Sequence, residues 1–355
     1  MRYTNEDLIY LQSKTLDEKI EHCLDMAQIF YIKMHGKAYL SFSGGIDSTV
    51  LRDLLNVENK KRNGGLWDKI PSVYCDTGLE YPEIKSFVKS FGDVEIIRPE
   101  MNFVETIRTF GYPLIRKEVA QAIEESRRVP GGAQDRRMHG EYVSSRTGKK
   151  AFDYSKFLPL KELPIPISHK CCKIMKKDPF KKYSKKTGLF PIVGTTTEES
   201  LLRKSSWIGR GCNTFEHGKE KCRPISVWKR QDILTYAKER DLRIAGCYGD
   251  IVWIGPDGDY MDVKPFSGDC KLKCTGCDRT GCVFCAFGMH SEVGETRYQR
   301  LKRTHPKLYE FALGGGEWIE RDGKQIWVAN KSGLGFAKVF DMVNEIYGKD
   351  FYRYE

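Results

Sequence analysis

The chain has 355 residues, of which 40% are hydrophobic and 30% are charged, and its formal net charge is +11. It is long enough for one large domain with a smaller lobe or for two domains, and it contains no apolar run of the length needed to span a bilayer. The positive charge suits polyanionic partners such as nucleotides or nucleic acids. The N-terminus lacks a signal-peptide core, and most of the twelve cysteines fall into close groups instead of a disulfide framework. We therefore expect a cytoplasmic protein with no membrane partner.

Helices and strands are predicted to alternate along the first part of the chain. A capping box at residues 15–18 begins one long helix before the first strand. The elements predicted next are a strand at 38–42, a helix at 48–55, a strand at 71–75, a helix at 81–91 and a strand at 94–98. This alternation predicts an α/β fold with a doubly wound parallel sheet, which binds its ligands at the carboxyl ends of its strands.

A basic, glycine-containing stretch at residues 127–163 interrupts the alternation. We expect a surface insertion or a lid there. The pattern then continues with a helix at 173–185, a strand at 190–194, and helices at 229–239, 294–312 and 335–347. The last part of the chain, from about residue 246, is rich in cysteine and glycine before it becomes helical.

The sequence Ser-Gly-Gly-Ile-Asp-Ser at residues 43–48 lies between the first strand and the next helix. Backbone N–H groups, two hydroxyls and a helix N-terminus at one point favour bound phosphate, and the glycines let the backbone approach an anion closely. Asp47 is placed to lie near a phosphate-bound Mg²⁺ or to orient the loop. An ordinary glycine-containing turn is the alternative, and the Walker pattern GxxxxGK[ST] is absent. The stretch resembles the PP-loop of the adenine-nucleotide alpha hydrolase superfamily, whose signature is SGGxDS.

Further motifs extend this resemblance. Asp76-Thr77-Gly78 ends the second predicted strand and precedes a Pro-Glu pair at residues 82–83. SGGxDS followed by DTG resembles the phosphoadenosine phosphosulfate (PAPS) reductase family. The match covers roughly residues 38–290 and includes Cys171-Cys172, Gly194, Glu199-Ser200 with Arg203, and Arg223-Pro224-Ile225. From the predicted elements and the resemblance we expect an N-terminal helix (1–36), a nucleotide-binding α/β domain (37–245) that contains the basic insertion at about 127–163, and a cysteine-rich, helical C-terminal lobe (246–355).

The resemblance also implies which residues bind the adenine nucleotide. They are Ser41, Ser43, Gly44, Gly45, Ile46, Asp47, Ser48, Asp76, Thr77, Gly78, Gly194 and Arg203. The expected catalytic residues are Asp47, Ser48, Arg203 and Lys173, of which Arg203 and Lys173 would neutralise phosphate or sulfate. The chain departs from the pattern at residues 195–197, where it has three threonines and some family members carry a further arginine.

The cysteines form the second strong motif. Cys274-x2-Cys277-x4-Cys282-x2-Cys285 has the spacing of one tetrahedral Zn²⁺ site or of an iron–sulfur cluster. The resemblance implies a competing ligand set, because family members with a [4Fe-4S] cluster use a Cys-Cys pair and a later CxxC. That set is Cys171, Cys172, Cys282 and Cys285. We expect [4Fe-4S] in preference to Zn²⁺, and we expect Cys212, Cys222 and Cys247 to be ordinary buried thiols.

Two observations separate this chain from the sulfate reductases that it resembles. Those enzymes attack the sulfate with a cysteine near the C-terminus, whereas the last cysteine here is Cys285. They also tend to have a degenerate PP-loop, whereas this loop keeps the full motif that cradles a β,γ-pyrophosphate. We therefore expect ATP to be cleaved to AMP and pyrophosphate to activate a target for sulfur transfer, as in DNA phosphorothioation or tRNA thiolation. The expected partners are an adenine nucleotide, DNA or tRNA, and a cysteine desulfurase or other sulfur donor. The sequence is also compatible with a homodimer.

Two alternatives accompany this hypothesis. One is a thiol-dependent PAPS or adenosine phosphosulfate reductase that makes sulfite, with Cys172 or another internal thiol as the nucleophile. The other is a nucleotide-regulated module that binds nucleic acid, for which the basic stretch at residues 127–163 is the main support. Product analysis separates all three.

Overall fold

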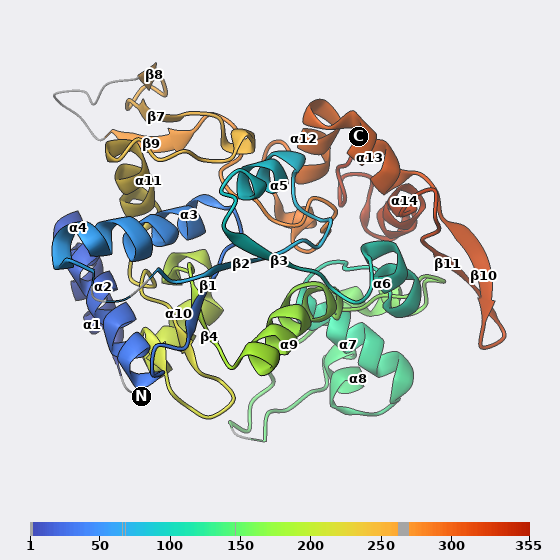
Figure 1. Cartoon of the computed structure of the whole chain (residues 1–355). Coiled ribbons are helices and arrows are strands. Elements are labelled where there is room, and N and C mark those ends of the chain that lie inside the picture. Colours follow the sequence, from blue (N-terminus) through green and yellow to red (C-terminus); the bar gives the residue numbers. More distant parts are fainter. Residues whose placement is uncertain (1–2, 66, 68, 146, 262–269) are drawn as a thin grey trace. The chain divides into compact units, whose positions relative to one another are not determined.

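The structure is a computed structural model that describes residues 3–65, 67, 69–145, 147–261 and 270–355 (Figure 1). Apart from the undescribed residues, the chain forms two compact units. The first consists of Met1–Asp76, Glu80–Arg98 and Pro179–Thr280, and the second of Thr77–Leu79, Pro99–Asp178 and Gly281–Glu355. Each unit is built from separate stretches, whereas the domains expected from the sequence are continuous, and that division stays a prediction. Within the described ranges, no helix combines the length and the apolar character needed to cross a bilayer.

A six-stranded, mostly parallel sheet lies in the first unit. Its order is β3-β2-β1-β4-β6-β5, with strands at Ala38–Ser41 (β1), Ser72–Cys75 (β2), Val94–Ile97 (β3), Phe190–Val193 (β4), Asn213–Thr214 (β5) and Lys221–Cys222 (β6). β1 pairs in parallel with β2 on one side and with β4 on the other, and β5 is antiparallel to β6. The expected α/β class with a parallel sheet is confirmed. The strand order reverses between β1 and β4, the place where open α/β sheets bind ligands.

Helices flank this sheet (Figure 1). They are α1 (Asn5–Ser13), α2 (Leu16–Lys33), α3 (Ile46–Asp53), α4 (Asn59–Asn63), α5 (Pro82–Lys89), α9 (Asp178–Thr187), α10 (Leu201–Arg210) and α11 (Arg230–Glu239), with a π-helical turn at Leu54–Glu58 and short 3₁₀ helices at Thr197–Glu199 and Gly246–Tyr248. α11 packs on α3, and its Asp232 accepts a 2.8 Å hydrogen bond from the buried Lys19 of α2. Tyr39, Val73 and Tyr183 belong to the core of this unit.

The first predicted helix is confirmed as α2, but it is not alone. Thr15 and Glu18 form the expected capping box at its start. α1 precedes it and was not predicted, because it buries only Leu8 and so lacks an apolar periodicity. A second, three-stranded sheet of order β8-β7-β9 completes this unit, with strands at Ile251–Ile254 (β7), Tyr260–Met261 (β8) and Lys271–Cys274 (β9).

The second unit is mainly helical. Its elements are α6 (Phe103–Phe110), α7 (Lys117–Arg128), α8 (Ala133–Met138), a 3₁₀ helix at Ser155–Lys161, a π-helical turn at Lys173–Lys177, a 3₁₀ helix at Met289–Ser291, α12 (Arg297–Thr304), α13 (Pro306–Leu313), the antiparallel hairpin of β10 (Glu317–Arg321) and β11 (Lys324–Val328), and α14 (Phe336–Tyr347). Its core is aromatic: Tyr112, Tyr298, Phe336, Phe340 and Tyr352 are fully buried and pack on one another. The stretch at 127–163 contains α8 and the 3₁₀ helix at Ser155–Lys161, so it is partly helical and not a plain loop.

Arg127 fastens this stretch to α7. Its guanidinium donates to four backbone carbonyls, at 2.8 Å to Leu160, 2.9 Å to Lys161, 3.0 Å to Leu163 and 2.7 Å to Ile165. The five N–H groups of a guanidinium can satisfy several acceptors in one plane, which an ammonium group cannot do. The side chain thus fixes the segment that leads to the Cys171-Cys172 pair.

Replacing Arg127 by alanine should lower the free energy of unfolding by about 3 kcal/mol, because carbonyls that the guanidinium satisfied would lose their partner. Urea denaturation followed by circular dichroism measures this. Arg128, the exposed next residue of α7, is the matched control, and Arg128→Ala should change stability by less than about 0.5 kcal/mol. Equal effects of the two substitutions would contradict the proposed role of Arg127.

Candidate functional site

The loop at residues 43–48 runs from the carboxyl end of β1 into α3, where the strand order reverses. Gly44 has a φ of +72°, and a Cβ there would stand 2.7 Å from Val88 Cγ2 and 2.9 Å from Ile84 Cγ2 of α5. Glycine is therefore required between β1 and α5. Gly45 is the N-cap of α3, and it adds no side chain at the helix end that favours anions.

Two serine hydroxyls close the loop on itself. Ser48 Oγ donates to the Gly45 carbonyl at 2.9 Å and accepts from the Ser43 backbone N–H at 3.2 Å. Ser43 Oγ lies 3.0 Å from Ser48 Oγ and accepts from the Gly45 N–H at 3.3 Å. These bonds join both ends of the motif, so its own residues stabilise the turn.

Tyr248 lies against the start of α3. Its hydroxyl accepts a 3.3 Å hydrogen bond from the Ile46 N–H and shares a 2.7 Å hydrogen bond with Thr280 Oγ1. Burial raises the pKa of this phenol, which therefore stays neutral at physiological pH. A neutral oxygen thus accepts the hydrogen bond of one N–H group at the N-terminus of α3, the end of the helix that attracts anions.

Gly194 follows β4 and packs on the first turn of α3. A Cβ at this position would stand 3.1 Å from both the Asp47 carbonyl oxygen and Ser48 Cα. Because these are backbone atoms, they cannot move aside without shifting the helix. The structure thus brings Gly194 together with residues 43–48, on the two sides of the strand-order reversal.

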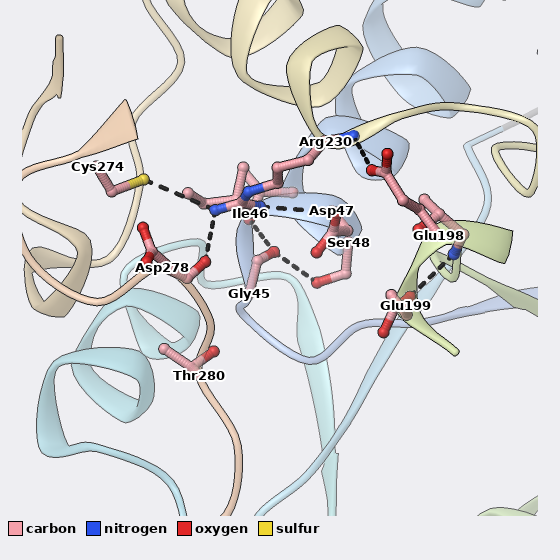
Figure 2. Close-up of polar contacts among 12 residues, drawn as sticks. Gly45, Ile46, Asp47, Ser48, Glu198, Glu199, Arg230, Cys274, Asp278 and Thr280 are labelled. Carbon is pink, nitrogen blue, oxygen red and sulfur yellow. Dashed lines mark hydrogen bonds and ion pairs between the residues drawn. The ribbon is translucent and has the colours of Figure 1, made fainter. Parts of the chain in front are cut away.

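Asp47 and Arg230 form the charged part of this site (Figure 2). Burial raises the pKa of the Asp47 carboxyl above its ordinary value, Arg230 and Arg279 lower it, and Glu199 raises it further. Arg230 Nη1 lies 3.9 Å from Asp47 Oδ1. The carboxylate therefore lies close to the positive charge of both arginines. A carboxyl pKa perturbed by burial and by nearby charges is common at functional sites.

Arg230 connects the loop to a cysteine-containing segment. Figure 2 shows its guanidinium between Asp47 on one side and Cys274 and Asp278 on the other. Its Nη2 donates to the Asp278 carbonyl at 2.6 Å and lies 3.7 Å from Cys274 Sγ, and its backbone N–H donates to Glu198 Oε2 at 2.6 Å. We did not predict this residue, since an arginine at the start of a helix carries no signal without the fold.

The other residues expected to bind the nucleotide or to act in catalysis are spread over both units. Asp76, just after β2 in the first unit, is buried and forms a 2.8 Å ion pair with Lys85 Nζ. Arg203, on α10, forms an ion pair with Glu199, which lies in the short 3₁₀ helix before α10. Ser41 is the last residue of β1. Thr77, Gly78 and Lys173 belong to the second unit, where Lys173 forms a 2.8 Å ion pair with Asp178.

Four cysteines line one small cavity of the second unit. They are Cys171, Cys172, Cys282 and Cys285, and the cavity is also lined by Leu79, Phe103, Pro113, Met175 and Lys176. The structure thus brings together the ligand set that the resemblance implies. Soft thiolates in an apolar wall are the surroundings that iron–sulfur clusters occupy.

The electrostatics of the cavity favour one charged thiolate. The Cys171 thiol lowers the pKa of Cys172 below its ordinary value, with Lys117 and Lys176 adding to the decrease against the effect of burial. Cys172 in turn, with burial and the thiols of Cys285 and Cys282, raises the pKa of Cys171. The two lysines therefore supply positive charge beside the thiols.

Contacts from α12 and from other parts of this unit hold the second CxxC in place. Arg297 Nη1 donates to the Cys285 carbonyl at 3.0 Å, and Tyr298 Oη donates to the Phe284 carbonyl at 3.0 Å. The Val283 N–H donates to the Leu79 carbonyl at 2.8 Å. These bonds fix the backbone, and thereby the two thiols of the motif, at the cavity.

The alternative ligand set is divided between the units, because Cys274 and Cys277 belong to the first and Cys282 and Cys285 to the second. Across the described parts of the chain, no three Cys, His, Asp or Glu side chains are already arranged around a common point as metal ligands. Metal binding at the four-cysteine cavity would therefore require the thiols to turn inward. The choice between the two ligand sets stays a prediction.

Comparison with models of known protein families finds no match for this chain, and comparison with curated proteins finds none either.

Gly194→Ala should weaken the binding of ATP about tenfold or more, because the new methyl group would press on the backbone of α3 at Asp47 and Ser48. Isothermal titration calorimetry measures the affinity. Gly209 in α10 is the matched control, since a Cβ there meets nothing within 4 Å. If Gly194→Ala binds ATP as tightly as Gly209→Ala does, the close contact at Gly194 has no part in binding.

Proposed function

We propose that the chain is a PP-loop enzyme of the PAPS reductase family that cleaves ATP to AMP and pyrophosphate to activate a target for sulfur transfer in the cytoplasm. The observation that carries the proposal is the SGGxDS loop, closed by Ser43 and Ser48 at the strand-order reversal and packed against Gly194. An anion seated there meets loop N–H groups, hydroxyls and the positive end of α3. The complete motif suits the β,γ-pyrophosphate of ATP, which PAPS lacks.

The loop residues would act on the departing pyrophosphate. An acceptor atom attacks the α-phosphorus, the bond to the bridging oxygen breaks, and pyrophosphate leaves with the electron pair. Ser43 and Ser48 would turn their hydroxyls from the bonds within the loop and donate to its oxygens, and Arg230 and Arg279 would stabilise its charge by preorganised electrostatics. Asp47 offers the oxygen ligands that Mg²⁺ prefers.

The four thiols at the cavity of the second unit fit a [4Fe-4S] cluster better than they fit Zn²⁺. Their wall is apolar and Lys176 adds a positive charge, which suits an anionic cluster with four thiolate ligands. When bound, such a cluster supplies electron transfer or holds sulfur for delivery. Cys171, Cys172, Cys282 and Cys285 would be its ligands.

The sulfur acceptor that we propose is a nucleic acid, DNA or tRNA. The net charge of +11 supports a polyanionic partner, and an adenylylated acceptor then needs a sulfur donor such as a cysteine desulfurase to displace AMP. The alternative acceptor is a small molecule, and analysis of the reaction products would distinguish it from a nucleic acid.

Asp47→Ala and Ser48→Ala should each reduce pyrophosphate release from ATP at least about 100-fold, because each removes a polar group from the phosphate site. Pyrophosphate and AMP are quantified in the presence of Mg²⁺ and candidate acceptors. Ser86→Ala, on the exposed face of α5, is the matched control and should leave release unchanged.

Unchanged release in both loop variants would exclude the proposal. Sulfite made from PAPS, and lost in Cys172→Ser, would instead support the thiol-dependent reductase. Salt-dependent binding of DNA or RNA without any nucleotide turnover would support the non-catalytic module.

Anaerobically purified protein should contain iron and acid-labile sulfide. Cys171→Ser and Cys282→Ser should lose most of the iron, whereas Cys274→Ser and Cys277→Ser should keep it, because only the first two line the cavity. Colorimetric iron and sulfide analysis measures both. Iron that is lost in Cys274→Ser but kept in Cys171→Ser would favour the alternative ligand set.

A further inference from the structure

The first CxxC pair lies beside a third cysteine in the first unit. Cys274 is the last residue of β9, and Cys247 lies in the short helix Gly246–Tyr248. The Cys277 N–H donates to the Cys247 carbonyl at 2.9 Å, and the Gly276 N–H donates to the Tyr248 carbonyl at 2.8 Å. The turn of the CxxC is thus bonded backbone to backbone to the segment that carries Cys247.

The contact between these two segments is tight. A Cβ at Gly276 would stand 2.5 Å from the Cys247 carbonyl oxygen, so no larger residue fits in the turn. Cys274 and Cys277 are buried, and Cys247 is partly buried. Main-chain bonds therefore hold the segment of Cys247 beside a CxxC pair that is well separated from it in the sequence, and Cys247 is not the isolated thiol that we expected.

A carboxylate belongs to the same place. The Cγ of Glu83, on α5, would lie 3.7 Å from a Cβ at Gly246, the residue before Cys247. α5 also packs on the short helix Gly246–Tyr248 that carries Cys247. A carboxylate and three thiolates at one place would repel one another, and a cation between them would remove that repulsion.

We propose that Cys247, Cys274 and Cys277, with Glu83 as the fourth ligand, bind a zinc ion in the first unit. Zn²⁺ prefers four ligands in a tetrahedron, CxxC pairs are common in its structural sites, and a carboxylate oxygen is also among the ligands that it binds. As at the four-cysteine cavity, the side chains must turn inward to bind the ion, since no described group is already arranged around one. Binding of this ion depends neither on the cluster nor on the nucleotide reaction proposed above.

The zinc site would support two residues that contact the nucleotide loop. Arg230 Nη2 lies 3.7 Å from Cys274 Sγ while its Nη1 faces Asp47. Tyr248, the neighbour of Cys247, bonds to the Ile46 N–H. An ion that fixes both cysteine segments would hold the guanidinium and the phenol at the loop, in the way that groups behind a metal ligand are oriented by it.

Elemental analysis of the full chain tests the proposal in a background that lacks the other thiol site. The Cys171→Ser/Cys172→Ser double variant should retain one zinc per chain. Adding Cys247→Ser, Cys274→Ser or Cys277→Ser should abolish zinc binding, whereas adding Cys270→Ser, a described cysteine outside this group, should leave it unchanged. Circular dichroism checks that each variant is folded.

Cobalt(II) serves as the probe if a cysteine variant does not fold. Co²⁺ added to the metal-free double variant should give thiolate-to-cobalt charge-transfer absorption, and Glu83→Gln should shift its ligand-field bands while the charge-transfer band remains. Absence of zinc from the double variant, zinc retained by Cys274→Ser, or a disulfide among the three cysteines under anaerobic purification would each overturn the proposal. Because metal content is the readout, the result does not depend on whether ATP is cleaved.

Discussion

The close approach of Gly194 to the backbone of Asp47 and Ser48 is the contact on which the site depends. It joins the two loops that leave the sheet on either side of the strand-order reversal. Gly44 makes a similar approach to α5. A larger residue at either glycine would change the spacing of the loop N–H groups, and hydrogen-bond strength falls steeply with distance and angle. Glycines therefore allow the loop after β4 to contact α3 closely and the loop after β1 to contact α5 closely.

Much of this arrangement could be predicted from local sequence, because a strand, a glycine turn and a capped helix each have short-range signals. The loop at 43–48 and the strands and helices around it belong to this class, whereas Gly194 came from the family resemblance and the strand order from the structure alone. α1 and the helical parts of 127–163 could not be predicted, because their apolar periodicity is weak. Arg230 also escaped prediction. Its role depends on where α11 packs, which no spacing in the sequence reveals.

The cysteines show the same limit more sharply. By spacing alone, Cys274, Cys277, Cys282 and Cys285 form one motif. The fold assigns its two halves to different units and gives each half its own partners, the Cys171-Cys172 pair in one and Cys247 in the other. Proximity in sequence limits which thiols can share an ion, but tertiary packing decides which of them do.

The phenol of Tyr248 has a consequence for selectivity. Because its oxygen already accepts the Ile46 N–H, a ligand oxygen that takes this N–H exchanges one hydrogen bond for another. A neutral oxygen gains almost nothing by the exchange, whereas a charged oxygen forms a bond roughly twice as strong. At this N–H the tyrosine therefore leaves a larger gain to an anionic oxygen than to water or an uncharged hydroxyl.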